Sequence, residues 1–207
     1  MMIYEMARDE RGSTAAEFAL ALPLLLVLLF GIIDAGRWMW TYNQAEKATQ
    51  MGARFAIVSD GVSSGLTSSY IGVGGLTQGD VIPASAFGKV SCTGSGSGNS
   101  VTASCNCATS PCPAGSTTAQ SAAFKNILNR MQLFLPQLAA NNVVVEYSSS
   151  GLGYAGSPVL PDLSPLVTVR VSGMSFRPLT TFDLATINMP AFATTLSAED
   201  LSGSVSN

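Results

Sequence analysis

The chain has 207 residues, 47% of them apolar and only 11% charged, against about 25% charged in soluble domains, and this composition indicates a membrane-attached or secreted protein. The net charge of −3 and the lack of a long basic run give nucleic-acid binding no electrostatic support. Histidine is absent, which removes the commonest general base and the usual imidazole metal ligand, and the acidic residues are scattered, so we expect no enzyme, no cofactor and no metal site.

A short polar segment, residues 1–12, precedes a long apolar run. Phe18–Ile33 is free of charge and spans about 24 Å as a helix, and small flanking residues bring it near the roughly 30 Å of a bilayer core. Glu17 and Asp34 stand at its two edges. The run is long and is followed by Asp-Ala-Gly-Arg-Trp, a poor small-x-small cleavage site, so it predicts a membrane-spanning anchor rather than a removable secretory signal. An aromatic group typical of a membrane interface comes next: Trp38, Trp40 and Tyr42.

The helical period continues beyond the apolar run. Small and apolar residues recur at three- and four-residue steps, and polar residues occupy much of the remainder. We therefore expect one helix from about Thr14 to Val58, about 68 Å long, with a hydrophobic stem and an amphipathic half that packs on a domain. Pro23 is a candidate kink. The recurring residues are Trp38, Tyr42, Ala45, Ala48, Gly52 and Phe55.

The region Ser59–Thr118 is rich in Gly, Ser and Thr and predicts a loop, with short strand edges at Ser68–Val73 and Val90–Cys92. Its even number of cysteines predicts disulfides, for which three pairings exist. The favoured pattern joins the first cysteine to one of the later three and the remaining two to each other, whereas a Cys105–Cys107 bridge would close a very tight ring. A zinc site is the alternative, but the spacing lacks paired C-x2-C knuckles. The candidates are Cys92, Cys105, Cys107 and Cys112.

The C-terminal part predicts a helix followed by strands. Apolar residues at helical spacing between Phe124 and Leu138 indicate a core-facing helix, which Pro136 kinks or ends late. Strands are predicted at Val143–Tyr147, Val167–Val171 and Phe192–Ser197, with Ser148–Pro158 as a connecting loop. The expected fold is α+β, a small, mainly antiparallel sheet with one face against this helix and the amphipathic half of the stem. The apolar stripe comprises Phe124, Ile127, Leu128, Met131, Leu135 and Leu138.

The junction before the apolar run resembles that of a type IV prepilin: Gly12, four small residues, then Glu17 and Phe18. In that family a membrane peptidase cuts after the glycine, which would leave Ser13 with a new α-amino group one helical turn before Glu17. The amine and the helix dipole both stabilise a carboxylate there. In a filament, Glu17 of one subunit would pair with the Ser13 amine of the next, an attraction much stronger away from water.

The longer stretch from Arg11 to Ala56 resembles the TadE-like pseudopilins of tight-adherence (Flp) pilus systems. The shared features are the Glu17-Phe18-Ala19 start, the Leu-Pro-Leu-Leu-Leu core, Asp34 before Gly36-Arg37, and Gly52-Ala53-Arg54. The C-terminal part is similar to one branch of this family. Its matching pieces are Asn142–Tyr147, Gly151–Tyr154, Val167–Val171, Met189-Pro190 and Glu199-Asp200.

This resemblance implies a minor, pilin-like component that supports initiation or assembly of the pilus. A prepilin peptidase would cut it between Gly12 and Ser13. It would cross the bacterial inner membrane once, with its C-terminal domain in the periplasm. It would reach the cell surface if it enters the pilus. Its partners would be other pilins through the stem and the assembly platform. The expected layout is leader 1–12, stem 13–58, cysteine loop 59–118 and α+β part 119–207. The alternative is an uncleaved, membrane-anchored periplasmic binding or adhesion module that holds a ligand near Gly151–Pro158.

Overall fold

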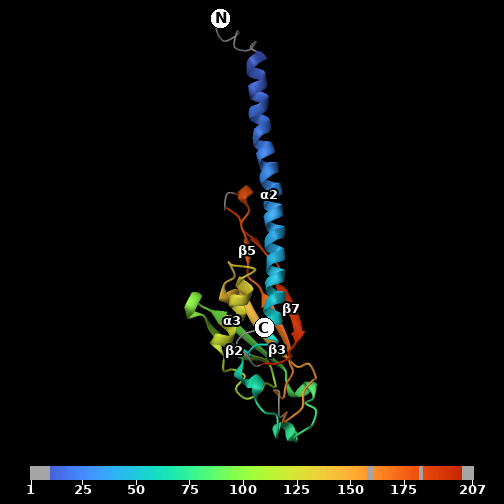
Figure 1. Cartoon of the computed structure of the whole chain (residues 1–207). Coiled ribbons are helices and arrows are strands. Elements are labelled where there is room, and N and C mark those ends of the chain that lie inside the picture. Colours follow the sequence, from blue (N-terminus) through green and yellow to red (C-terminus); the bar gives the residue numbers. More distant parts are fainter. Residues whose placement is uncertain (1–9, 158–160, 182–183, 202–207) are drawn as a thin grey trace. The chain divides into compact units, whose positions relative to one another are not determined.

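The computed structural model describes residues 10–157, 161–181 and 184–201. The chain forms two compact units: the first contains the chain up to Thr41 together with Ser175–Asn188, and the second contains Tyr42–Met174 and the chain from Met189 onward. Helix α2, Glu10–Ala56, runs through both units (Figure 1). The boundary at Thr41 lies close to the point where the sequence pattern predicts the change from hydrophobic stem to amphipathic half.

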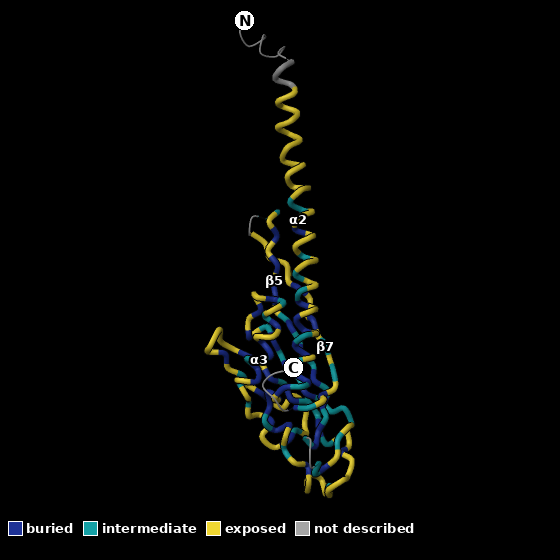
Figure 2. The backbone as a smooth tube through the Cα atoms, in the orientation of Figure 1, coloured by how far each residue is buried: buried dark blue, intermediate teal, exposed yellow. Residues whose placement is uncertain are grey.

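Helix α2 is continuous over 47 residues, about 70 Å. Leu, Ala and Met are strong helix formers and supply much of its sequence. The helix begins four residues before the expected Thr14 and ends two before the expected Val58. Pro23 lies inside it without ending it. Figure 2 shows the two halves of α2 clearly, an exposed N-terminal stretch and a C-terminal stretch with a buried stripe.

The sheet of the second unit has five antiparallel strands in the order β2-β1-β3-β4-β7. Three of these were predicted, and their bounds are close to those expected. The strands are β1 Lys89–Ser95, β2 Thr102–Thr109, β3 Val143–Ser148, β4 Leu166–Val171 and β7 Phe192–Ser197.

One face of this sheet is buried and carries both helices. In register, Cys92 of β1 lies opposite Val145 of β3, and Val145 lies opposite Val169 of β4, so these side chains share a face. A Cβ placed on Gly52 of α2 would lie 3.3 Å from Val169, and one placed on Gly94 of β1 would meet the ring of Phe124. The C-terminal half of α2 therefore covers β4, and α3, Ser121–Gln132, covers β1 on the same face. This is the packing predicted from the amphipathic patterns.

Helix α3 ends earlier than predicted. It stops at Gln132, before Pro136, and the chain continues as turns. The residue before a proline disfavours helical angles, so a helix running as far as Leu138 was an overestimate. The predicted apolar stripe is nevertheless buried in full, from Phe124 to Leu138.

The cysteine-rich region differs from the predicted loop because it contributes two strands. β1 and β2 pair along their whole length, and β2 is the outer strand of the sheet. The predicted strand edge at Val90–Cys92 lies within β1, whereas Ser68–Val73 is not a strand. The two disulfides lie in this region, and elsewhere it is turns with short 3-10 helices. The 3-10 helices of the chain are η1 Ser64–Thr67, η2 Val73–Gly75, η3 Ala84–Ala86, η4 Gly98–Ser100, η5 Ala140–Asn142 and η6 Leu179–Thr181.

The first unit contains a hairpin that the sequence did not predict. Strands β5, Ser175–Phe176, and β6, Ile187–Asn188, pair antiparallel and have only two residues each. The segment that joins them includes η6. Figure 1 shows β5 alongside α2. We refer to the described residues 175–181 and 184–188 as the β5–β6 hairpin.

Candidate functional site

The predicted processing junction lies in the first turns of α2. Gly12 and Ser13 belong to the helix, and Glu17 follows Ser13 by four residues, which places the two positions on one helix face a turn apart. Glu17 is exposed, and Phe18 keeps 64% of its accessible surface. Glu17 and Phe18 are therefore displayed on the surface of α2, while cleavage after Gly12 and the pairing of Glu17 with a neighbouring amine stay predictions.

Among the described residues, α2 is the single helix long and apolar enough to cross a membrane. None of its most apolar window is buried inside the protein. Exposed apolar surface costs roughly 25 cal/mol per Å² in water, so this stretch requires hydrocarbon or other helices around it. The large exposed side chains between positions 20 and 33 are Leu20, Leu22, Leu24, Leu25, Leu26, Val27, Leu28, Leu29, Ile32 and Ile33.

Asp34, at the end of the apolar run, binds the hairpin. Its side chain is buried, and its oxygens accept the backbone N–H groups of Leu179 and Thr180, both at 2.9 Å. The Thr180 hydroxyl and the Arg37 guanidinium donate to the same carboxylate at 3.0 Å each. Asp34 thus satisfies the N–H groups that open η6, as an N-cap residue does, from 145 residues away in sequence. The resemblance drew attention to Asp34, but not to this role.

Contacts with an aromatic ring of the hairpin add to its attachment to α2. The ring of Trp38 meets that of Phe176 edge-on, with 5.4 Å between centroids. The guanidinium carbon of Arg37 lies 5.3 Å from the centroid of the same Phe176 ring, within the range of a cation–π contact. One turn of α2 therefore holds the hairpin by charge, hydrogen bonds and ring packing.

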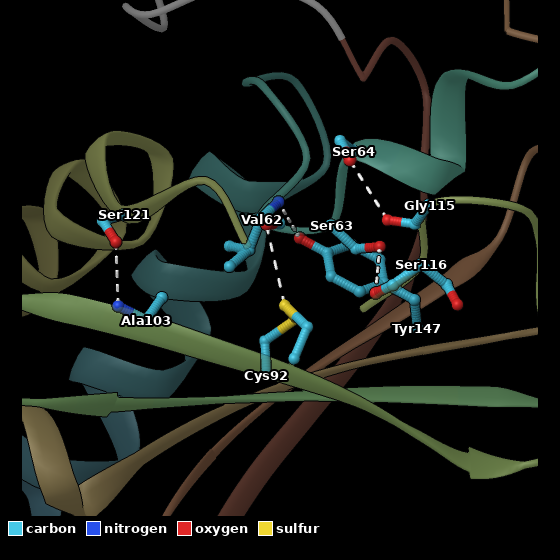
Figure 3. Close-up of a disulfide and its surroundings, with 10 residues drawn as sticks. Val62, Ser63, Ser64, Cys92, Ala103, Gly115, Ser116, Ser121 and Tyr147 are labelled. Atoms are coloured by element: carbon cyan, nitrogen blue, oxygen red, sulfur yellow. Dashed lines mark hydrogen bonds between the residues drawn. A yellow bond between two sulfur atoms is a disulfide. The ribbon is translucent and has the colours of Figure 1, made fainter. Parts of the chain in front are cut away.

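The first disulfide, Cys92–Cys105, joins residues that face each other across β1 and β2. Both cysteines are buried, and Figure 3 shows the bridge beneath the segment that follows α2. The second, Cys107–Cys112, ties the end of β2 to the loop beyond it, with Cys107 exposed. These pairs match the favoured pattern, and a cysteine joined in a disulfide has no thiolate to offer a metal.

The segment after α2 is fastened to the sheet around the first disulfide. The backbone N–H of Val62 donates to the Tyr147 hydroxyl at 2.9 Å, and the Val62 carbonyl oxygen lies 3.7 Å from the Cys105 sulfur. Ser63 donates its hydroxyl to the Ser116 carbonyl at 2.8 Å (Figure 3). Burial raises the pKa of Tyr147, so its hydroxyl stays protonated at physiological pH. This arrangement serves structure rather than proton transfer.

A second buried carboxylate, Asp162, organises the Gly-rich loops. It accepts backbone N–H groups from Tyr70, Gly156 and Ser157 at 2.6–2.9 Å, and the Ser69 hydroxyl at 3.2 Å. Burial alone would raise the pKa of Asp162, but these hydrogen bonds outweigh it and hold the pKa below its usual value. The predicted ligand loop near Gly151–Pro158 is thus occupied, in its described part, by a carboxylate of the protein itself.

The exposed face of the sheet is polar. Glu146 accepts a hydrogen bond from Arg170 at 3.2 Å and lies 3.7 Å from Lys89, and the Thr168 and Thr195 hydroxyls are 2.8 Å apart. Such partly exposed ion pairs contribute little to stability, about 0–1 kcal/mol each. No group of three or more acidic or cysteine side chains suited to a metal occurs in the described residues.

In the described residues, an apolar helix long enough to cross a membrane is followed by an antiparallel sheet and a second helix, an arrangement that defines an α+β fold with a candidate membrane anchor. Within that class, the family model for TadE-like protein matches residues 12–54. The match starts at Gly12 and lies wholly within α2, and it confirms the resemblance on the stem. The matched residues make up less than half of the chain. Neither a curated protein nor a solved structure matches the chain.

Proposed function

We propose that this chain is a minor pilin-like component that supports initiation or assembly of a tight-adherence (Flp) type IV pilus. The observation that carries this proposal is the TadE-like match over residues 12–54, which includes the Gly12–Ser13 junction, Glu17 and Asp34 on one continuous helix. A prepilin peptidase would cut between Gly12 and Ser13 and leave the stem in place.

The chemistry of the stem supports assembly. A carboxylate in hydrocarbon costs about 2.5–3.5 kcal/mol on insertion scales, so a cation supplied within the assembly would favour burial of Glu17 among the stems. Cleavage would create a cation at Ser13, and a neighbouring subunit would supply that cation to Glu17. The exposed apolar half of α2 gives the stems of other pilins a surface to pack on.

The disulfides support placement of the second unit in the periplasm. Disulfides persist in oxidising compartments and are rare in the cytosol, and this unit contains two of them. A single crossing by α2 then leaves the N-terminal segment on the cytoplasmic side, where the leader would be presented to the peptidase. With this orientation, the proposed partners are the inner membrane, the peptidase, other pilins and the assembly platform.

Intact-mass analysis of the protein extracted from its native membrane tests the proposal. The expected mass corresponds to a chain that begins at Ser13. A Gly12→Leu variant is the matched control, since a bulky side chain at the cut site should leave the full-length mass. If the native protein keeps Met1 and the same mass is found in cells without the peptidase, the proposal fails and the uncleaved, anchored binding or adhesion module takes its place.

A further inference from the structure

The β5–β6 hairpin exposes three large apolar side chains. Leu179, Leu184 and Ile187 keep 48%, 90% and 49% of their accessible surface. Single exposed leucines are common on soluble proteins, but burial of each such side chain is worth about 1.5–3 kcal/mol. Their grouping on one short hairpin points to an apolar medium that surrounds this element.

The attachment through Asp34 fixes the level of the hairpin along the stem. Asp34 directly follows Phe18–Ile33, the run that needs hydrocarbon, and it binds the two N–H groups that open η6. Phe30 and Gly31, one turn nearer the N-terminus, are half-buried, unlike the exposed residues before them. The hairpin therefore lies at the end of the apolar run and not beyond it.

A hollow between hairpin and stem extends further into the run. Its lining is Pro23, Leu26, Val27 and Phe30 of α2 together with Thr180 of the hairpin. From Pro23 to Phe30 the helix rises about 10 Å, so the hollow lies at a depth where the stem itself requires hydrocarbon. Thr180 is the one polar residue of this lining, and its hydroxyl already donates a hydrogen bond to Asp34. The remaining lining of the hollow is apolar.

Polar groups at this level match the headgroup layer. Arg37 and Arg177 are exposed, and Trp40 keeps 68% of its surface. Tryptophan concentrates at membrane interfaces, and arginine places its apolar stem in the boundary and its charge in the headgroups. The sequence of features along this unit, apolar run, capped carboxylate, then cations and tryptophan, is that of a membrane boundary.

We propose that the β5–β6 hairpin is a membrane-contacting element. Leu179, Leu184 and Ile187 enter the headgroup–acyl boundary of the bilayer that holds α2, and acyl chains occupy the hollow beside Pro23–Phe30. The Asp34 carboxylate, which accepts hydrogen bonds from the hairpin and pairs with Arg37 of α2, lies at the boundary between lipid and water. This inference rests on the apolar stem and does not depend on a role in the pilus.

Depth-dependent fluorescence quenching tests this contact. The full-length chain carries Trp38→Phe and Trp40→Phe, so that a third substitution, Leu184→Trp, supplies its single tryptophan. One copy of this variant is placed in each nanodisc. The nanodiscs contain phosphatidylcholine that is brominated at either shallow or deep positions of its acyl chains. Leu133→Trp is the matched control, a leucine 69% exposed in the second unit. We expect at least twofold quenching at position 184, stronger with shallow bromines, because interfacial elements bury their apolar face about 5–10 Å into the boundary.

Two results would overturn the proposal. The first is quenching at position 184 no greater than at position 133, which would place the hairpin in water. The second is a tryptophan at position 184 whose fluorescence is not quenched by brominated lipid in single-copy nanodiscs, but whose emission maximum shifts to the blue when several copies share a nanodisc. That outcome would assign the exposed leucines to a second copy of the chain and not to lipid.

Discussion

Asp34 and Asp162 show how single carboxylates organise this protein. Each is buried, and each accepts backbone N–H groups from segments far away in sequence. Charge-assisted hydrogen bonds of this kind contribute about 1.5–3 kcal/mol, more than neutral ones. The two residues therefore decide the positions of loops that have little regular structure of their own.

Replacement of Asp34 by alanine should release η6. Loss of the acceptor should cost the local structure about 1.5–3 kcal/mol, so the amides of Leu179 and Thr180 should exchange with deuterium about ten- to a hundredfold faster. Hydrogen-exchange mass spectrometry of the hairpin peptide measures this. Asp80→Ala is the control, since Asp80 accepts the Thr77 N–H in the second unit and should leave hairpin exchange unchanged. Equal exchange in wild type and Asp34→Ala would contradict the capping role.

The depressed pKa of Asp162 predicts a loss of stability in acid. A carboxyl whose pKa is lower in the folded than in the unfolded state stabilises the fold above its unfolded pKa, about 3.9, and this contribution disappears as pH falls through the folded value. Asp162→Asn should cost about 1–3 kcal/mol at pH 7, and the difference from wild type should shrink below about pH 4. Thermal unfolding across pH 2–7 checks this, and a constant difference would refute it.

The sequence predicts the location of Asp34 but not its function. The residue stands out as a charge at the edge of an apolar run, and the resemblance singles it out as well. Its partners lie 145 residues away, and no local pattern connects them. Asp162 gives no signal at all, because a lone aspartate in a loop usually faces water. Contacts between distant, irregular segments depend on the completed fold, so they escape reasoning from periodicity.

At the level of elements, the fold depends on the close approach of α2 to the sheet and α3. The buried stripe of α2 is made of small residues, which allow its backbone to come near its neighbours. At Gly52 a Cβ would lie only 2.7 Å from the Met131 side chain. The sequence predicts Ala45, Ala48 and Gly52 of this stripe, because their three- and four-residue spacing persists over several turns, but it does not predict Ala53 or Ala56. Its buried small residues are Ala45, Ala48, Gly52, Ala53 and Ala56.

A larger side chain at Gly52 should separate these elements. Gly52→Val should destabilise the second unit by about 1–3 kcal/mol through overpacking against Met131 and Val169. Gly36→Val is the matched control on the same helix, because nothing lies within 4 Å of a Cβ at Gly36, and its effect should stay within about 0.5 kcal/mol. Thermal unfolding in detergent compares them, and equal effects would argue against the close contact.

Strands β1 and β2 were harder to predict than β3 and β4, and within them only Val90–Cys92 was expected as a strand edge. β3 and β4 contain runs of valine with alternating burial, the standard strand signal. β1 and β2 contain Ser, Thr, Gly, Ala, Asn and Cys, which also occur in loops, and their pairing is reinforced by a disulfide. The two-residue strands β5 and β6 are too short to leave a period. Covalent and tertiary contacts thus override weak local preference.

The two disulfides should differ in their response to reductant. Cys92 and Cys105 are buried, whereas Cys107 is exposed and Cys112 half-buried. Because thiol–disulfide exchange requires access to the sulfur, mild dithiothreitol should open Cys107–Cys112 at least about tenfold faster than Cys92–Cys105. Timed alkylation followed by peptide mass spectrometry gives both rates. Loss of the buried bridge first would show that the β1–β2 edge opens readily.

For the whole molecule, the proposed assembly role depends on Glu17. Removal of one partner of a desolvated charge pair costs about 2–5 kcal/mol, so Glu17→Gln should lower incorporation into sheared pili or assembly complexes at least about tenfold while membrane insertion persists. Glu46→Gln makes the same change at an exposed site on the same helix and should incorporate normally. Immunoblots of sheared and membrane fractions compare them. Normal incorporation of Glu17→Gln would defeat the charge-pair hypothesis.

Both sulfur bridges are local: their cysteines are 13 and 5 residues apart, and all four precede α3. If the chain is threaded through a translocon in order, oxidation at these sites needs nothing from β3, β4 or β7, which emerge later. The β1–β2 ribbon can therefore be locked while the rest of the polypeptide is still in transit, and it then offers a preformed template on which β3 adds. Folding of this protein would then begin at the β1–β2 ribbon in the middle of the chain, while its C-terminal part is still being exported.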